Sequence, residues 1–322
     1  MMGSVSHNFH FHDLQPAQDD FHTDVIAGLS GKTKYLSPKF FYDEQGSQLF
    51  DAITRLPEYY PTRTEIGLLQ RYGEDMARLL GDDGILVELG SGSDTKIRVL
   101  LEAIQPQTYA PVDICREYLR MAAGAIAEDH PRLEVHAICT DFTKPFALPD
   151  LLDARQRAAF FPGSSIGNFD PAQARELLRS IARLLGPAGR LLIGVDLKKS
   201  PELLHAAYND DQGVTAKFNL NLLERINREL DADFDIDAFR HEAFYNEKLG
   251  RVEMHLVATA PQRVRVNGCR FEFQPGESIH TENSYKFSIE EFQVLAAQSG
   301  LASVQVWQDD DALFSVHCLR PV

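Results

Sequence analysis

Apolar residues between positions 64 and 139 follow two different periods in alternation. Short apolar runs, typical of strands buried on both faces of a parallel sheet, stand at Ile85–Leu89, Tyr109–Ile114 and Leu133–Cys139. Steps of three and four residues, the spacing of one helix face, link three further sets of positions: Leu69, Tyr72, Met76, Leu79 and Leu80, then Ile97, Leu100, Leu101 and Ile104, then Leu119, Ala122, Ala123 and Ile126. The pattern predicts one helix followed by a βαβαβ unit.

The same alternation continues to residue 195. Ala158–Phe161 and Arg190–Val195 are two more strand-like runs. Between them a helix is predicted from Asp170, a suitable N-cap residue followed by proline, to Leu185. Strands that alternate with helices predict a doubly wound α/β domain with a parallel sheet and right-handed crossovers.

The C-terminal end of the chain predicts a helix and a β-hairpin. Ile289–Ser299 has a helical pattern, and Ser303–Trp307 and Leu313–Leu319 have strand-like patterns. Asp309–Asp311 lies between these strands as a polar turn. We therefore expect the α/β domain to close with a hairpin.

Residues 1–61 and 197–286 do not fit the alternation. The second stretch contains a predicted helix over Phe218–Leu230 and two predicted strands, Val252–Ala258 and Val264–Phe273. We predict that 62–196 and 287–322 form the α/β core, and that 1–61 and 197–286 form a smaller α+β domain.

Composition narrows the class of protein. The chain has 322 residues with 44% hydrophobic residues, enough for about two domains. Its formal net charge of −15 makes nucleic acid and anionic membranes unfavourable partners. We find neither a signal-peptide pattern nor an apolar run long enough to span a membrane. The four cysteines form no CxxC pair, which indicates a reducing compartment. We expect a cytoplasmic monomer that acts on a small molecule.

Three histidines near the N-terminus, His7, His10 and His12, are the first candidates for metal binding. They stand in a polar terminal arm. A metal centre would require further ligands, and no cysteine or carboxylate pattern lies nearby. We therefore predict no metal site in this protein.

The loop after the first core strand is the first candidate ligand site. It reads ELGSGSDTK, with Glu88 inside the strand, Gly90 and Gly92 in the loop, and Thr95 where a dinucleotide fingerprint has its third glycine. Glycines at this place let the backbone approach a ligand closely at a helix N-terminus. Asp113 ends the second strand and is placed to accept hydrogen bonds from a ribose diol.

Asp141 and Phe142 follow the third strand. They offer a carboxylate for an exocyclic adenine amine and an aromatic ring for its face. Together with the glycine loop, Asp113 and the terminal hairpin, this arrangement resembles the Rossmann-like class I S-adenosylmethionine methyltransferases. The absence of the third glycine disfavours a nicotinamide cofactor, because a sulfonium cofactor has no pyrophosphate to bind.

Longer strings give a closer resemblance. They are FFYDEQGSQLFDAITRLPEYYPTRTE, FFPGSSIGNF, AYNDDQGVTAKFNLNLLERIN, VEMHLVA and IHTENSYKFS, and they run from about residue 33 to the end. These strings resemble the histidine Nα-methyltransferase family of ergothioneine biosynthesis. The resemblance implies trimethylation of histidine to hercynine with S-adenosylmethionine as the methyl donor.

The resemblance also implies roles for individual residues. Asn168 and Tyr208 would hold the substrate carboxylate, and Glu282 and Ser284 would bind the imidazole. The α-amine would be lined and oriented by the catalytic pair Tyr42 and Tyr59, with Phe50 and Met254 packed beside it. The residues that would bind the cofactor are Gly90, Lys96, Asp113, Asp141 and Phe142.

Two alternatives stay open from the sequence. One is an N-methyltransferase for another amino acid or amine, including an aromatic one, because a few exchanges can change a pocket. The other is a noncatalytic sensor of S-adenosylmethionine, because a fold does not determine a function. Glu282 and Ser284 favour histidine over the first alternative, and a complete set of substrate residues argues against the second.

Overall fold

The computed structural model describes residues 7–14, 19–81, 84–92, 94–149, 152 and 156–322 of the chain. The chain forms two compact units. The core unit comprises Pro61–Lys198, Lys286–Val322 and the N-terminal segment that contains Phe9–Asp13. The satellite unit comprises Lys199–Tyr285 and the segment from Asp19 to Tyr60.

The core unit contains an eight-stranded sheet with the order β1-β5-β4-β3-β6-β7-β14-β13. Its strands are β1 (Phe9–Asp13), β3 (Ile85–Leu89), β4 (Thr108–Asp113), β5 (Glu134–Cys139), β6 (Arg157–Phe161), β7 (Arg190–Asp196), β13 (Leu301–Gln308) and β14 (Phe314–Pro321). The neighbours from β1 to β7 are parallel, whereas β14 is antiparallel to both β7 and β13. The predicted doubly wound sheet and terminal hairpin are therefore confirmed.

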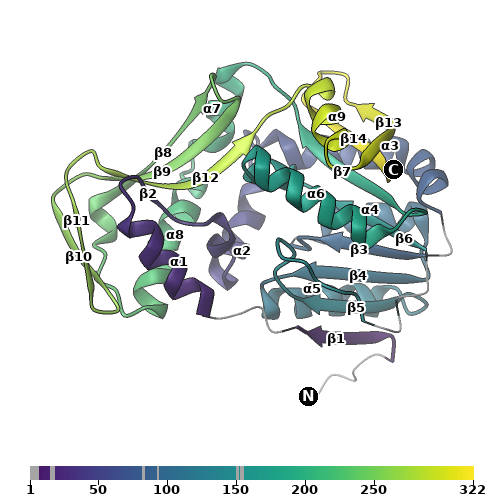
Figure 1. The fold of residues 1–322 in the computed structure, drawn as a ribbon, viewed down its shortest axis with the longest axis horizontal. Helices are drawn as coiled ribbons and strands as arrows, with labels where there is room; N and C mark the ends of the chain where they lie inside the picture. Colours follow the sequence, from purple (N-terminus) through teal and green to yellow (C-terminus); the bar gives the residue numbers. More distant parts are fainter. Residues whose placement is uncertain (1–6, 15–18, 82–83, 93, 150–151, 153–155) are drawn as a thin grey trace. The chain divides into compact units, whose positions relative to one another are not determined.

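Helices cover both faces of this sheet, as Figure 1 shows for α6 in front of the strands. The helices are α3 (Tyr60–Leu80), α4 (Thr95–Ile104), α5 (Arg116–Asp129), α6 (Pro171–Leu185) and α9 (Ile289–Ala297). Apolar side chains of α3, α4 and α5 pack in one buried cluster with one face of the strands. Those of α6 and α9 pack in a second cluster with the other face. The result is a three-layer core whose helices match the predicted ones.

The N-terminal arm differs from our prediction. We assigned residues 1–61 to the smaller domain, but Phe9–Asp13 forms β1 at the edge of the core sheet and pairs in parallel with β5. Asn8 supports this position by donating its amide hydrogens toward three carbonyl oxygens near the end of α5 and the start of β5, at 2.8–3.1 Å. A five-residue strand with alternating histidines has too weak an apolar pattern to be recognised from the sequence.

The satellite unit holds a four-stranded sheet with the order β2-β12-β9-β8. Its strands are β2 (Lys34–Tyr35), β8 (Phe239–Asn246), β9 (Arg251–Ala258) and β12 (Ser278–Tyr285). Its helices are α1 (Asp19–Ser30), α2 (Glu44–Ile53), α7 (Pro201–Tyr208) and α8 (Val214–Glu229), with short 3-10 turns η1 (Pro38–Phe41) and η4 (Ile236–Ala238). The predicted helix over 218–230 and strand over 252–258 correspond to α8 and β9.

The predicted single strand Val264–Phe273 is wrong. The structure has a hairpin there, with β10 (Gln262–Val266) and β11 (Cys269–Phe273) paired antiparallel. Asn267 and Gly268 form the turn with φ of 44° and 82°. Asn-Gly is the preferred sequence for such a two-residue turn. This signal was present in the sequence, and in the structure the turn interrupts the alternating side-chain pattern from which we predicted a single strand.

Among the described residues, no helix combines the length and apolarity that crossing a bilayer requires.

A buried ion pair joins three segments of the core unit. Lys96 Nζ at the start of α4 lies 2.6 Å from Glu65 Oε2 on α3, and Glu65 is fully buried. The amide of Gly163, in the loop after β6, donates to the same carboxylate at 2.9 Å. Gly194 on β7 makes room for it, because a Cβ there would lie 2.0 Å from Glu65 Oε1. Sequence reasoning did not find Glu65.

This arrangement predicts different costs for two substitutions of Glu65. Glu65→Ala leaves the Lys96 ammonium and the Gly163 amide without their acceptor, and we expect it to lower the free energy of unfolding by about 3–5 kcal/mol. Glu65→Gln keeps a hydrogen-bond acceptor at the same place and costs less. Urea unfolding followed by circular dichroism measures both. Glu102→Ala, at an exposed position on α4, is the control. Equal stability of Glu65→Ala and the control would contradict the assigned role of the pair.

Candidate active site

The glycine loop after β3 has the close turn that its sequence predicts. Gly90 has a φ of +74°, a left-handed conformation that favours glycine. Its amide and that of Ser91 donate to the Val112 carbonyl of β4, at 2.9 and 3.1 Å. A Cβ on Gly90 would lie 3.6 Å from the ring of Phe142, so the loop after β5 lies directly beside this turn.

Glu88 is a buried acid directly under this loop. It is fully buried on β3, and its Oε2 accepts a hydrogen bond from the Tyr109 hydroxyl, which also contacts Ser91 Oγ at 3.1 Å. Burial raises the pKa of Glu88 to about 7. Its Oε1 is buried without a hydrogen-bond partner in the described structure. The end of β3 therefore holds a buried carboxyl oxygen that no described residue satisfies.

Asp113 stands at the last position of β4, as predicted. Its Oδ1 accepts a hydrogen bond from the Cys115 amide at 2.8 Å. Burial raises the pKa of Asp113 to about 6. Because its carboxylate lies at the carboxyl end of a parallel strand, it is available where ligands of this fold class bind.

Asp141 and Phe142 follow β5 at the same edge of the sheet. Asp141 is buried, and its Oδ1 accepts hydrogen bonds from the Thr143 amide and hydroxyl at 3.0 and 2.5 Å. The Phe142 ring packs edge-on against Phe161, with centroids 5.7 Å apart. Gly90, Asp113, Asp141 and Phe142 therefore cluster at the carboxyl edge, where the sequence placed them.

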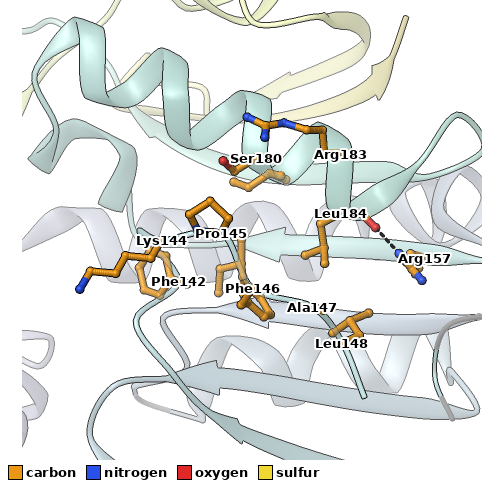
Figure 2. Close-up of a pocket in the computed structure, with 12 residues that line it drawn as sticks. Phe142, Lys144, Pro145, Phe146, Ala147, Leu148, Arg157, Ser180, Arg183 and Leu184 are labelled. Atoms are coloured by element: carbon orange, nitrogen blue, oxygen red, sulfur yellow. Dashed lines mark hydrogen bonds between the residues drawn. The ribbon is translucent and has the colours of Figure 1, made fainter. Parts of the chain in front are cut away.

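A pocket in the core unit begins at Phe142 (Figure 2). Phe142, Pro145 and Phe146 line one side, and Ser180, Arg183 and Leu184 of α6 line the other. Arg157 at its far end donates to the Leu184 carbonyl at 2.6 Å. Of the predicted cofactor residues, Phe142 alone is among the lining residues that the structure describes. The pocket therefore adjoins the aromatic end of the candidate cofactor site.

The satellite unit gathers most of the predicted substrate residues. Tyr42 and Phe50 pack edge to face at 5.8 Å between ring centroids, and Phe50 and Tyr59 at 6.3 Å. Tyr59 also packs against Tyr208, at 6.4 Å. Phe218 of α8 lies 6.0 Å from both Tyr42 and Phe50. We interpreted Phe218 only as part of a helix face, and the structure adds it to this aromatic cluster.

The end of η1 and the start of α2 fix the backbone beside Tyr42. Asp43 caps α2 by accepting from the Gly46 amide at 2.7 Å. The same Oδ1 accepts from Asn221 of α8 at 3.0 Å, and the other carboxylate oxygen pairs with Arg228 at 2.5 Å. Tyr42 therefore directly precedes a residue, Asp43, that is tied to α8 by a hydrogen bond and an ion pair.

An extra residue in β12 sets the direction of Glu282 and Ser284. His280 pairs with His255 of β9, but Glu282 pairs with Met254, so the register shifts by one residue at Thr281. Paired residues share a face of the sheet. The bulge therefore places Glu282 and Ser284 on the face of Met254, and leaves His280 on the opposite face with His255.

Tyr208 contacts Ser284 directly, although the sequence assigned these two residues to different ends of the substrate. The Tyr208 hydroxyl donates to Ser284 Oγ at 2.7 Å, in a buried position. Ser284 pairs with Val252 in the sheet and so lies on the Met254 face. The structure thus brings together Tyr208, Ser284, Met254 and Glu282 in the satellite unit.

Asn168 belongs to the core unit. We placed it at the end of the fourth strand of the alternation, but β6 ends at Phe161, and Asn168 is the last residue of the 3-10 turn η3 (Ser165–Asn168). Gly163 and Ser164 before this turn have φ of 76° and 57°, and Ser164 Oγ accepts from the Asp196 amide at 2.9 Å. This sharp turn is what separates Asn168 from the strand.

One group of potential metal ligands exists among the described residues. Ligand atoms of Glu253, His255 and His280 lie within 4.8 Å of one another. The two imidazole rings are stacked, with centroids 4.7 Å apart and planes 13° from parallel. Metals bind the lone pair in the imidazole plane, so rings stacked in this way do not direct their lone pairs at one ion. Glu253 also pairs with Arg251 at 2.9 Å. The geometry favours a hydrogen-bonded stack.

Two of the three N-terminal histidines lie in a strand, whereas we described all three as part of a polar arm. His10 and His12 lie on β1, and both rings stack on His136 of β5, with centroids 4.5 and 5.3 Å apart. His12 Nε2 also lies 3.1 Å from His136 Nδ1. His7 is exposed before the strand. The two strand histidines therefore help to dock β1.

Comparison with known proteins agrees with this geometry. The family model of histidine-specific, S-adenosylmethionine-dependent methyltransferases matches residues 21–321. The histidine N-alpha-methyltransferases of Mycolicibacterium smegmatis and Mycobacterium tuberculosis are 44% and 41% identical over 299 residues, which cover 91% of this chain and 92% of each relative. Ergothioneine biosynthesis protein 1 of Neurospora crassa is 31% identical, over 85% of this chain and 32% of that protein. The chain belongs to the family of histidine-specific, S-adenosylmethionine-dependent methyltransferases.

Proposed function

We propose that this enzyme transfers three methyl groups from S-adenosylmethionine to the α-amine of L-histidine. The product would be the betaine hercynine, and the reaction would serve ergothioneine biosynthesis. The observation that carries the proposal is the match of the histidine-specific family over residues 21–321. The shared face of Glu282, Ser284 and Met254 supports it, because it combines a carboxylate and a hydroxyl with an apolar side chain, as an imidazole ring requires.

The core residues fit the cofactor. Gly90 gives close backbone approach, Asp113 would accept from the ribose hydroxyls, and Asp141 and Phe142 would bind the adenine amine and ring face. The unpartnered, buried Oε1 of Glu88 offers a further acceptor. Lys96, which Glu65 holds at the start of α4, is a further residue proposed to bind the cofactor. When bound, the sulfonium supplies the electrophilic methyl group.

Before attack the histidine amine has to lose its proton, because an ammonium nitrogen has no lone pair. We propose that Tyr42 and Tyr59 orient the amine and pass this proton toward solvent through their hydroxyls. Phe50 and Met254 would pack beside the amine and exclude water. Asn168 and Tyr208 are proposed to hold the substrate carboxylate, which fixes the amine for an in-line approach. These residues position reactants and need no covalent intermediate.

We further propose that the enzyme works as a monomer in the cytoplasm on this small-molecule substrate. Its acidity, with a net charge of −15, does not favour a nucleic-acid or membrane surface as a partner.

The proposed reaction can be tested directly with purified enzyme. We expect histidine and S-adenosylmethionine to give hercynine and S-adenosylhomocysteine in the presence of a metal chelator, followed by mass spectrometry. Phenylalanine and tryptophan serve as competing substrates. Methylation of another amino acid with no mass gain on histidine would contradict the proposal, and cofactor binding without any transfer would favour a sensor.

Replacement of Asp113 tests the ribose site. Asp113→Ala should weaken cofactor binding by about 1.5–3 kcal/mol, the cost of losing hydrogen bonds to a charged acceptor. Isothermal titration measures this loss of affinity. Asp129→Asn, at an exposed position of α5, is the control. Normal affinity in a folded Asp113→Ala protein would show that this aspartate only shapes the turn.

The pKa of Asp113 adds a pH signature to the same measurement. Hydroxyl donors favour the ionised carboxylate, whose pKa in the free protein is about 6. Affinity should therefore be full above about pH 7 and fall as the pH drops through 6. Asp113→Asn should lose this part of the pH dependence, while any contribution of Glu88 remains in both proteins.

Replacement of Glu282 tests whether this residue recognises the imidazole of the substrate. Glu282→Ala removes a charge-assisted hydrogen bond and should lower kcat/KM for histidine by roughly ten- to a hundredfold. Aromatic amino acids should lose much less or gain, because they do not use the carboxylate. Glu272→Ala, at an exposed glutamate of β11, is the matched control. A constant ratio of histidine to phenylalanine turnover in Glu282→Ala would remove Glu282 from substrate recognition.

A further inference from the structure

A chain of buried and partly buried hydrogen bonds runs through the satellite unit from Tyr208 to the bulge in β12. His241 Nε2 on β8 lies 2.9 Å from the Tyr208 carbonyl oxygen, which can only accept. This fixes the imidazole as the donor at Nε2. Asn219 Nδ2 on α8 lies 2.9 Å from His241 Nδ1 and therefore donates to it.

Asn219 continues the chain to the bulge. Its amide also donates to the His255 carbonyl of β9 at 3.0 Å, and its Oδ1 accepts from the Thr281 hydroxyl at 2.8 Å. Thr281 Oγ1 lies 3.1 Å from the Met254 carbonyl as well. Asn219 is fully buried, and Thr281 is 1% exposed. Both amide hydrogens and the amide oxygen of Asn219 are thus used.

The protonation state of His241 fits this chain. Burial lowers the pKa of His241, which keeps the ring neutral with a lone pair on Nδ1 for Asn219. A protonated ring would place an N–H of His241 against an N–H of Asn219. Buried polar chains are specific when every donor and acceptor is matched, as here.

This hydrogen-bond chain ends at Thr281, where the register of β12 against β9 shifts by one residue. Side chains alternate along a strand, so without the bulge Thr281 would pair with Met254, and Glu282 and Ser284 would turn to the face of His255. Asn219 holds both sides of the bulge, since it bonds Thr281 on β12 and the His255 carbonyl on β9. The other end of the chain holds Tyr208, whose hydroxyl donates to Ser284.

We propose that Asn219 and Thr281 are positioning residues for substrate selection, which hold the bulge of β12 so that Glu282 and Ser284 face the histidine side chain. This inference rests on the proposed function, because Glu282 and Ser284 matter only if they bind substrate. Neither Asn219 nor Thr281 needs to touch the substrate, and their effect is on its recognition.

The test uses Thr281→Val, which removes the hydroxyl at nearly constant shape. We expect the KM for histidine to rise by about tenfold, while the KM for S-adenosylmethionine changes by less than about twofold. Thr281→Ser keeps the hydroxyl and should return the histidine KM to within about threefold of the unmodified enzyme. A general structural defect would raise the KM for both substrates.

Asn227→Ser is the matched control. Asn227 lies on the same helix and bonds the Phe234 backbone at 2.8 and 2.9 Å, away from the bulge, so its loss should leave the histidine KM unchanged. If Thr281→Val no longer binds the cofactor, Asn219→Asp takes its place, because it keeps the acceptor for Thr281 and loses both donors. The same rise in histidine KM is then expected.

Failure of the proposed function and failure of the positioning role give different results. An unmodified enzyme that does not methylate histidine overturns the proposed function and this inference with it. An enzyme that methylates histidine, but whose Thr281→Val or Asn219→Asp variant keeps its histidine KM, overturns the positioning role alone.

Discussion

The alternation of side chains along a β-strand is the constraint on which the satellite half of this enzyme depends. In β12, one additional residue at Thr281 reverses the faces of everything that follows. Before it, His280 stacks on His255; after it, Glu282 and Ser284 join Met254. A polar chain of neutral, fully matched hydrogen bonds surrounds the insertion. The chemistry of the proposed substrate site therefore follows from a backbone irregularity as much as from residue type.

The core unit depends on buried or partly buried carboxyl groups. Acids stand at or near the carboxyl ends of neighbouring parallel strands, and burial raises the pKa of Glu88 to about 7 and that of Asp113 to about 6. Such carboxyl groups gain most from a ligand that donates hydrogen bonds to them. Glu65 has the opposite task, since it neutralises Lys96 within the fold. Acidic groups thus serve both the proposed cofactor site and the framework around it.

Much of the fold could be predicted from the sequence, because every core helix and strand from α3 to β7 has apolar residues at the spacing typical of its type. The errors came from short segments. The strand β1 has only five residues and owes its place to pairing with β5, and the β10–β11 hairpin depends on a two-residue turn. The placement of Gly90, Asp113, Asp141 and Phe142 at one edge of the sheet was also predictable, because the carboxyl ends of parallel strands lie at the same edge. The bulge at Thr281 and the Glu65 pair were not, since both depend on partners distant in sequence.

We propose that the enzyme selects its substrate by the imidazole of histidine. The most direct measurement is isothermal titration of histidine and of phenylalanine into enzyme saturated with S-adenosylhomocysteine. Because the Glu282 carboxylate can accept a hydrogen bond from an imidazole N–H and would lose its hydration against an apolar ring, histidine should bind at least about tenfold more tightly. Equal affinities for the two amino acids would show that the enzyme does not recognise the imidazole.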